Sequence, residues 1–256
     1  IQNCIISLNR NYYNTFGIYS NSNTQNTSNL TDGTVVSPFG NNSGLKIYSN
    51  QISDVNIGIV VVGPQASANH NEGLDIGGDG LGNTITNYGL GFITGSFVSP
   101  NLVSGLSNGI LVRYTNNFNI LYNTIQSSNG GVLSGHHRAI FIPSYGTNSN
   151  NFVIGSPVNT ISNNYISVKS GSNNPITGIF CEGSAFNSST TLNIENNTFT
   201  DFGHSVSSNA AIKFISNTTS ALNVTINDNI IENITINSTG SITFVENDAV
   251  KPNNSI

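Results

Sequence analysis

The stretch Ile161-Ser162-Asn163-Asn164-Tyr165-Ile166 decides the fold, because its pattern recurs along the whole chain. The pattern is an aliphatic residue, two variable positions, an Asn, one variable position and another apolar residue. Clear copies are Ile47-Asn50-Ile52, Ile120-Asn123-Ile125, Ile194-Asn197-Phe199 and Ile226-Asn229-Ile231. Weaker copies at Ile6-Asn9, Asn83-Ile85 and Val98-Asn101-Val103 bring the Asn intervals to roughly 18 to 41 residues, a range in which regular recurrence indicates a repeat protein.

A second pattern places a small residue before an apolar one and stays in step with the first. Its copies are Gly17-Ile18, Gly58-Ile59, Gly91-Phe92, Gly109-Ile110, Ala139-Ile140, Gly178-Ile179, Ala211-Ile212 and Ser241-Ile242. We interpret the small residues as a column in which a larger side chain would meet the neighbouring coil.

Around each Asn the apolar residues alternate with polar ones, as in Leu192-Asn193-Ile194-Glu195. This alternation is typical of a strand with one buried face, and the segments are too short for helices. Equivalent strands stacked about 4.8 Å apart would bury a continuous apolar column. We therefore predict an all-β, single-domain solenoid of about eight coils over residues 1–256.

The Asn positions have a physical role in such a stack. Identical amides at this spacing can hydrogen-bond as a ladder, and Asn tolerates the left-handed backbone that tight turns often need. We predict a ladder on consecutive coils formed by Asn50, Asn83, Asn101, Asn123, Asn164, Asn197 and Asn229.

From Cys4 to Val245 the repeat resembles the right-handed parallel β-helix family, the pectate-lyase-like solenoids. The resemblance implies a right-handed parallel β-helix. It also implies, for members that are enzymes, polysaccharide cleavage by a basic residue with calcium or by paired carboxylates. Polygalacturonase-like hydrolases share Asn-Thr-Asp, paired-Asp, Gly-His-Gly and Arg-Ile-Lys motifs, and this chain has none of the four. The resemblance is therefore specific for fold and not for function.

Composition limits the classes of partner. The net charge is −5 and the chain has only 7 Lys and Arg residues, so we expect no nucleic-acid partner. No apolar run reaches the length of a membrane-spanning helix, so we expect no membrane insertion. Because the chain has no Met and its first residues already fit the strand pattern, we expect an excerpt of a longer polypeptide. The Lys-poor repeat, rich in Asn, Ser and Thr, favours an extracellular or cell-surface location. Cys4 and Cys181 fall on distant coils and are expected to be free thiols.

The best catalytic candidates are His136, His137 and Arg138, because His can titrate near neutrality and Arg can neutralise a uronate carboxylate. Glu182 could complete this set, and Arg113 occupies the matching offset in an earlier copy of the second pattern. A polar loop and a surface ion pair explain the same residues without catalysis, and we favour that interpretation.

An acidic, Gly-rich segment around Asp75 and Asp79 offers oxygen atoms that could bind calcium. A structural turn is the simpler interpretation. We expect no cofactor, with calcium at this segment as the one candidate.

The residue after each apolar position of the second pattern should point outwards. These residues form an apolar stripe of Tyr19, Val60, Ile93, Leu111, Phe141 and Phe180, before the pattern changes to Lys213 and Thr243. A patch of this kind is rarely bare on a soluble monomer. The chain's own loops, another domain or subunit, or a polysaccharide could cover it, and we favour the loops.

The sequence favours a noncatalytic β-helix module of a secreted or cell-surface bacterial protein, acting as a rigid stalk or as an adhesive or glycan-contacting surface. The expected partners are other domains of the same polypeptide or a protein subunit, with polysaccharide as a further candidate. A polysaccharide lyase or glycoside hydrolase is the alternative, and a viral tail-spike-like fibre is the third hypothesis.

Overall fold

The computed structural model describes residues 1–12, 15–21, 41–64, 70–89, 107–130, 136–143, 156–183, 186 and 189–248. In these ranges every regular element is a β-strand, and most strands belong to three long parallel sheets. The same ranges hold no helix that is long and apolar enough to cross a membrane.

The sheets are numbered by the order in which the chain crosses them from β3 onward, through β3, β4 and β5. The first sheet contains β3 (Lys46–Ile47), β7 (Asp75–Ile76), β11 (Asn119–Leu121), β14 (Val158–Ser162), β17 (Thr191–Glu195) and β21 (Asn223–Asn227). The second contains β1 (Ile5–Ser7), β4 (Gln51–Ser53), β8 (Thr84–Thr86), β12 (Thr124–Gly130), β15 (Tyr165–Ser170), β18 (Thr198–Thr200) and β22 (Ile230–Glu232), with β19 (Gly203–His204) beside β15. The third contains β2 (Phe16–Asn21), β5 (Ile57–Val62), β9 (Ser107–Arg113), β13 (His137–Ile142), β16 (Ile176–Cys181), β20 (Ile212–Asn217) and β23 (Ile242–Asn247). A short fourth pair joins β6 (Asn71–Glu72) to β10 (Thr115–Asn116).

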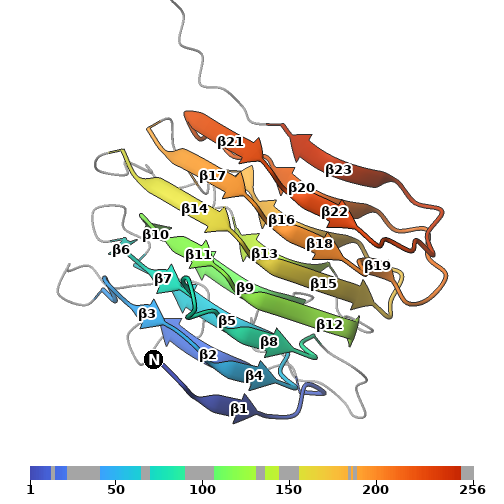
Figure 1. Cartoon of the computed structure of the whole chain (residues 1–256), viewed down its shortest axis with the longest axis horizontal. Coiled ribbons are helices and arrows are strands. Elements are labelled where there is room, and N and C mark those ends of the chain that lie inside the picture. Colours follow the sequence, from blue (N-terminus) through green and yellow to red (C-terminus); the bar gives the residue numbers. More distant parts are fainter. Residues whose placement is uncertain are drawn as a thin grey trace, which may run out of the picture.

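The chain visits the three long sheets repeatedly in the same order, and one such visit is termed a pass. Strands of consecutive passes pair in parallel, so that the passes stack from the blue N-terminal strands to the red C-terminal ones (Figure 1). The seven strands of the third sheet correspond to seven passes within the described residues. This arrangement confirms the predicted all-β stack of parallel strands and is compatible with a parallel β-helix.

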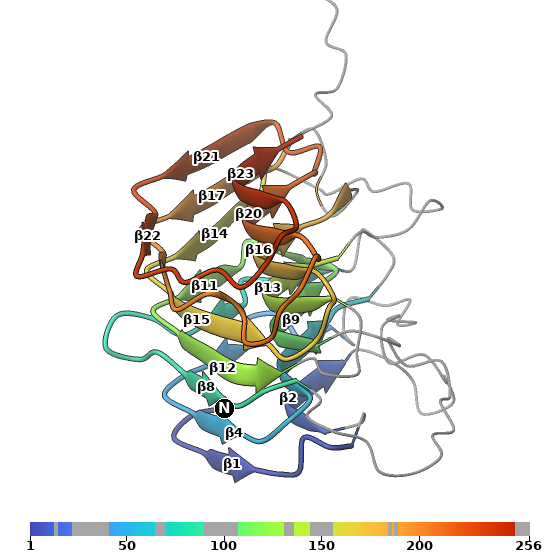
Figure 2. The ribbon, with the colours of Figure 1, turned by 90° about the vertical axis from the view of Figure 1, so that its right-hand side faces the viewer.

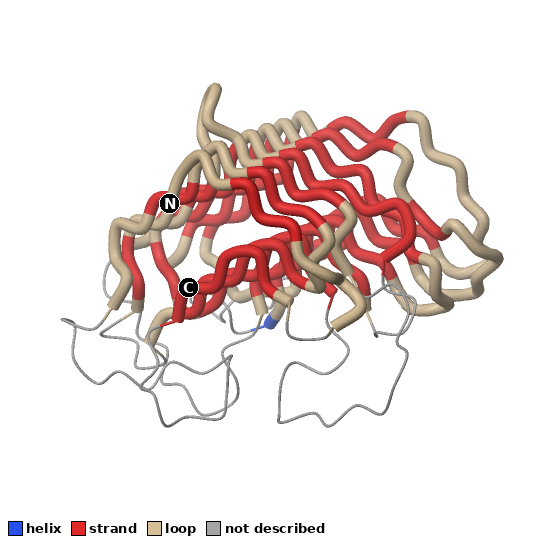
Figure 3. Tube along the Cα trace, turned by 90° about the horizontal axis from the view of Figure 1, so that it is seen from below, coloured by secondary structure: helices blue, strands red, loops and turns tan. Residues whose placement is uncertain are grey.

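Each sheet supplies a column of apolar side chains to one core, and the three sheets lie around a common interior (Figure 2). Successive strands run side by side when seen from below (Figure 3). The columns pair in register: Ile47, Ile76, Ile120, Ile161 and Ile194 in the first sheet; Ile52, Ile85, Ile125, Ile166 and Phe199 in the second; Ile59, Ile110, Ile140, Ile179 and Ile215 in the third. All of these side chains are buried, so burial of apolar surface favours the stack.

The predicted ladder exists and connects the turns between the first and second sheets. Its members are Asn50, Asn83, Asn123, Asn164, Asn197 and Asn229. Each Nδ2 donates to Oδ1 of the next Asn at 2.9 to 3.0 Å, and each backbone N–H donates to the same oxygen at 3.0 to 3.1 Å. Nδ2 also reaches back, as where Asn123 donates to the Ile76 carbonyl at 2.8 Å.

The left-handed backbone lies one residue before the ladder and not at the ladder Asn itself. The φ angle is 52° at Ser49, 57° at Tyr122 and 56° at Asn163. This conformation is costly for a residue as bulky as Tyr, so the surrounding turn must hold it in place.

The ladder has one member fewer than predicted, and the prediction for Asn101 is wrong. Asn83 donates directly to Asn123, and β8 pairs directly with β12, which leaves no pass between them. For the same reason Gly91-Phe92 is not a copy of the second pattern, since β5 pairs directly with β9. Asn101 and Gly91-Phe92 themselves lie outside the described residues.

The register of the first pass also differs from the prediction. Ile6 pairs with Ile52 and therefore belongs to the second sheet. The Cys4 backbone N–H donates to Asn50 Oδ1 at 3.0 Å, so Cys4 takes the place of a ladder Asn instead of an inward apolar position. Cys4 and Cys181 are both free, as predicted.

In the last two passes, the column of small residues is occupied by aromatic residues instead. Ile212 pairs with Ile176, so Phe214 and not Ala211 stands beside Gly178. Phe244 follows Phe214 in the stack, with ring centroids 5.5 Å apart. The same column therefore holds small residues in the earlier passes, up to Gly178, and the stacked rings of Phe214 and Phe244 in the last two passes.

Gly178 tests the reason for the small column. A Cβ built there would lie 2.5 Å from the Phe214 carbonyl oxygen and would also meet the Phe199 ring. Gly178→Ala is expected to lower the free energy of unfolding by about 1 to 3 kcal/mol, as overpacked cores do. At Gly78 the nearest atom to a new Cβ is 3.8 Å away, so Gly78→Ala should leave stability nearly unchanged in urea unfolding. Equal losses in the two variants would contradict this explanation.

Asn123 tests the ladder. Asn123→Ala removes the acceptor of the Asn83 amide and the donor to Asn164, and it leaves both buried. The free energy of unfolding of the variant, measured in urea, is expected to be about 2 to 4 kcal/mol lower. Each unpaired buried polar group costs about 1 to 3 kcal/mol. Asn193 is the matched control, because no side-chain hydrogen bond is described for it on β17. A loss in Asn193→Ala as large as in Asn123→Ala would contradict the role of the ladder.

Candidate functional site

The predicted catalytic run is divided between two sides of the third sheet. His137 is fully buried and faces the core, where its Nδ1 lies 2.6 Å from Ser107 Oγ. The Tyr88 ring stacks on the imidazole at 4.9 Å between centroids, and Tyr88 Oη donates to the Arg138 carbonyl at 2.9 Å. His137 therefore belongs to the packing of the interior.

Arg138 and His136 lie on the outer side of the same sheet. Arg138 Nη2 is 3.0 Å from His136 Nδ1, and His136 Nε2 is 2.6 Å from Thr177 Oγ1. The guanidinium carbon is 4.1 Å from the centroid of the Phe141 ring and 5.4 Å from that of Phe180. Only 6% of Arg138 is exposed, so the structure holds its charge against the faces of aromatic rings and away from solvent.

Burial makes His136 and His137 poor general acids or bases. Desolvation, followed by the charge of Arg138, lowers the pKa of His136 to about 3. Desolvation lowers the pKa of His137 to about 3 as well, with a smaller contribution from His136. Burial lowers the pKa of Arg138 to about 10, opposed by the charge of Glu182. A general base works best with a pKa near the working pH, and neither imidazole meets that condition at neutrality.

Glu182 lies beside the end of β13, where its N–H donates to the Ile142 carbonyl at 2.9 Å. Arg113 ends β9, on the other side of β13. Strand β13 therefore lies between Glu182 and Arg113, and their backbones are roughly 10 Å apart, which is two strand spacings. Arg113 packs instead over the Tyr114 ring, with the guanidinium carbon 4.7 Å from its centroid.

Four residues of the apolar stripe, Val60, Leu111, Phe141 and Phe180, belong to a hydrophobic cluster that is separate from the core. Its members Val60, Leu111 and Phe141 are at most 3% exposed, so they offer no open binding surface. Tyr19 is 38% exposed and Phe180 is half-buried. Ile93 lies outside the described residues.

The stripe also continues differently from the prediction. Phe180 pairs with Ser216, which pairs with Glu246. Lys213 and Thr243, which the sequence placed in the stripe, belong to the neighbouring column of Arg138 and Thr177.

The calcium candidate Asp75 is held within the first sheet. Its Oδ1 accepts from Asn119 at 2.8 Å, while Oδ2 accepts from Tyr48 at 3.0 Å and pairs with Lys46. These hydrogen bonds and the Lys46 charge outweigh desolvation and lower the pKa of Asp75. Asp79 is exposed. Across the described ranges no three His, Cys, Asp or Glu side chains gather as metal ligands would.

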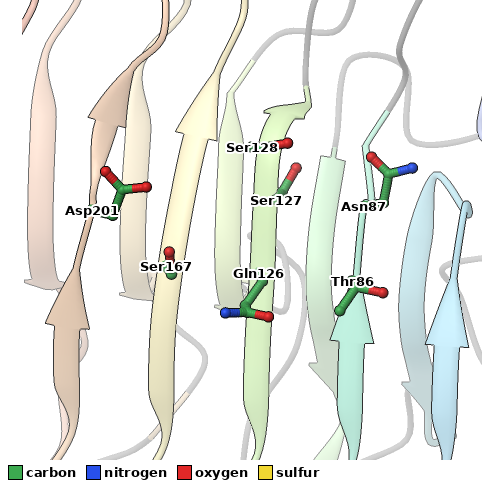
Figure 4. A pocket seen from close by; sticks show the side chains of 7 residues that line it. All are labelled: Thr86, Asn87, Gln126, Ser127, Ser128, Ser167 and Asp201. Atoms are coloured by element: carbon green, nitrogen blue, oxygen red, sulfur yellow. The ribbon is translucent and has the colours of Figure 1, made fainter.

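A polar groove of about 350 Å³ lies on the second sheet, where sequence analysis placed no site. Its lining comes from β8, β12, β15 and the turn after β18 (Figure 4). The lining residues are Thr86, Asn87, Gln126, Ser127, Ser128, Ser167 and Asp201. All carry hydroxyl, amide or carboxylate groups, so the groove is a hydrogen-bonding surface.

The groove forms where the passes differ from one another. Strands β8 and β18 end immediately before the left-handed residues Asn87 and Asp201, which have φ of 54° and 47°. Strands β12 and β15 lack that turn and run on to Gly130 and Ser170. The two longer strands therefore pass between two turns, and the groove lies over them (Figure 4).

The amino-acid sequence marks the passes that form the groove. The residue two places after the apolar position of the second sheet is Asp54, Asn87, Asp201 or Asn233 in four passes, and all four have positive φ. The two intervening passes have Ser127 and Val168 there. Asp and Asn favour such turns and Val does not, so the change of residue type marks the longer strands.

Comparisons of the chain with protein-family models, with curated proteins and with solved structures find no match.

The buried imidazole of His137 predicts a pH dependence of stability. Its folded-state pKa is about 3, whereas the unfolded chain titrates near about 6.5. Between these values the unfolded chain binds a proton that the folded chain does not, so stability falls as the pH falls. From about pH 6.5 to about pH 4.5, His137 should contribute a loss of about 2 to 3 kcal/mol.

His137→Gln removes this titration and should reduce the loss of stability over this pH range, measured by urea unfolding, by about 2 to 3 kcal/mol. His136 and His204, whose pKa values are also lowered, titrate in both chains, so part of the pH dependence should remain in the variant. If the variant and the native chain lose the same stability over this range, His137 is not buried in its neutral form.

Proposed function

We propose that the chain is a right-handed parallel β-helix of the pectate-lyase-like architecture. In this proposal it is a noncatalytic module of a secreted or cell-surface bacterial protein, acting as a rigid stalk or adhesive surface. The single observation that carries the proposal is the uninterrupted Asn ladder from Asn50 to Asn229, together with one core through the same passes.

The ladder supports a stalk because it links every neighbouring pair of passes between these two residues. In a stacked repeat each unit contacts only its neighbours, so rigidity depends on the weakest junction. Here each junction combines parallel strand pairing in three sheets with the buried amide bonds, as between Asn123 and Asn164.

The surroundings of the candidate catalytic residues support a noncatalytic role. Glycoside hydrolysis uses two carboxyl groups roughly 5 to 9.5 Å apart. The strand positions on either side of Glu182 hold Pro143 and Thr218, neither of which is acidic. Lyase chemistry needs an accessible base beside a charge-neutralising group, but His137 is fully buried and Arg138 nearly so.

The proposal predicts that the purified chain does not depolymerise polysaccharides. Incubation with polygalacturonate and with neutral glucans should release neither new reducing ends nor unsaturated uronates. Cleavage that disappears in Arg138→Ala, while Lys46→Ala stays active and both variants remain folded by circular dichroism, would instead establish the lyase or hydrolase alternative. Lys46 is the control because it lies on the first sheet, away from Arg138 on the third, and its charge pairs with Asp75 of the same sheet.

A further inference from the structure

The polar groove on the second sheet contains a row of side chains that the fold does not use. Gln126 on β12 pairs in register with Thr86 on β8 and with Ser167 on β15. All three are half-buried and line the groove (Figure 4). Within the described part of the chain, their side chains have no hydrogen-bond partner. Partly buried polar groups usually have partners, so this row is available to a ligand.

The charge of the groove favours a neutral ligand. Asp201 is the one ionisable side chain in the lining, and its carboxylate pairs with Lys169. The remaining lining groups are hydroxyls and amides, which both donate and accept hydrogen bonds. An acidic polymer would meet the Asp201 carboxylate without an unpaired cation in the lining to neutralise it.

The lining also argues against a protein partner. Protein interfaces and drug-like ligand sites have an apolar or aromatic centre, and every side chain in this groove is polar. Ser127 already donates to the Tyr88 carbonyl at 2.7 Å, which holds that part of the floor in place. A ligand rich in hydroxyl groups complements such a surface.

The spacing of the row suits an extended chain of sugars. Adjacent strands lie about 4.8 Å apart, which is close to the length of one hexose in an extended polysaccharide. A glycan crossing β8, β12 and β15 would therefore meet one of Thr86, Gln126 and Ser167 per sugar. Tyr165 lies two residues before Ser167 on the same face and is 40% exposed, so its ring can pack against a sugar beside the groove.

We infer that the groove over β8, β12 and β15 binds a neutral, extended polysaccharide segment through the row Thr86, Gln126 and Ser167. This site names the surface and the ligand class for the adhesive role, and it rests on the proposed function in that respect. It lies on a different sheet from His136, Arg138 and Glu182, so it does not depend on their chemistry.

The test is isothermal titration calorimetry of the folded chain with cellohexaose, a galactomannan and dextran as neutral probes and with polygalacturonate as the acidic probe. At least one neutral probe is expected to bind, and more tightly than polygalacturonate. Gln126→Ala should weaken that binding roughly five- to tenfold, the effect of losing one hydrogen bond. Tyr165→Ala should weaken it as well.

Gln51→Ala is the matched control, because Gln51 is exposed on β4 of the same sheet but outside the groove. It should bind like the native chain. The inference is overturned if no neutral probe binds, if polygalacturonate binds more tightly, or if Gln126→Ala and Gln51→Ala bind alike. Cleavage of a bound probe would contradict the noncatalytic role while supporting the groove, so the two proposals fail separately.

Discussion

The structure depends on a stack of buried amides in which each Asn side chain is satisfied by groups of the neighbouring passes. Asn83, for example, accepts from Asn50 and donates to Asn123, so neither its oxygen nor its nitrogen is left unpaired. A shift of one residue in any pass would leave a buried amide without a partner. The ladder therefore sets the register, and the register aligns the Ile columns of the core.

Two outer faces differ from this regular stack: the face of the third sheet around Arg138 and the polar groove on the second sheet. Each arises from a different change in the repeated pass. On the third sheet, the outward positions carry enough apolar side chains to form a second buried layer, which encloses Arg138 against Phe141. On the second sheet, two passes omit a left-handed turn and leave open polar positions along β12 and β15. One face is closed by packing, while the other keeps its hydrogen-bonding groups accessible.

The local pattern was enough to predict strands, inward columns and a ladder, because the Ile and Asn positions around Asn164 have the same spacing in each clear copy. It was not enough to assign every copy to a pass. Asn101 fits the pattern but not the stack, and Cys4 fits the stack but not the pattern. The inward direction of His137 was missed because alternation is interrupted where Ala139 and Ile140 both face the core. The groove was missed because it depends on four strands together.

The direction of the hydrogen bonds makes the molecule mechanically anisotropic. In all three sheets and in the ladder, they run along the stacking axis, from one pass to the next. Because the passes lie in series along that axis, every junction carries the same axial pull and the weakest separates first, whereas a pull along the strands would shear many bonds together. Such a module would resist lateral drag more strongly than axial tension, and under axial load it would lengthen in steps of one pass.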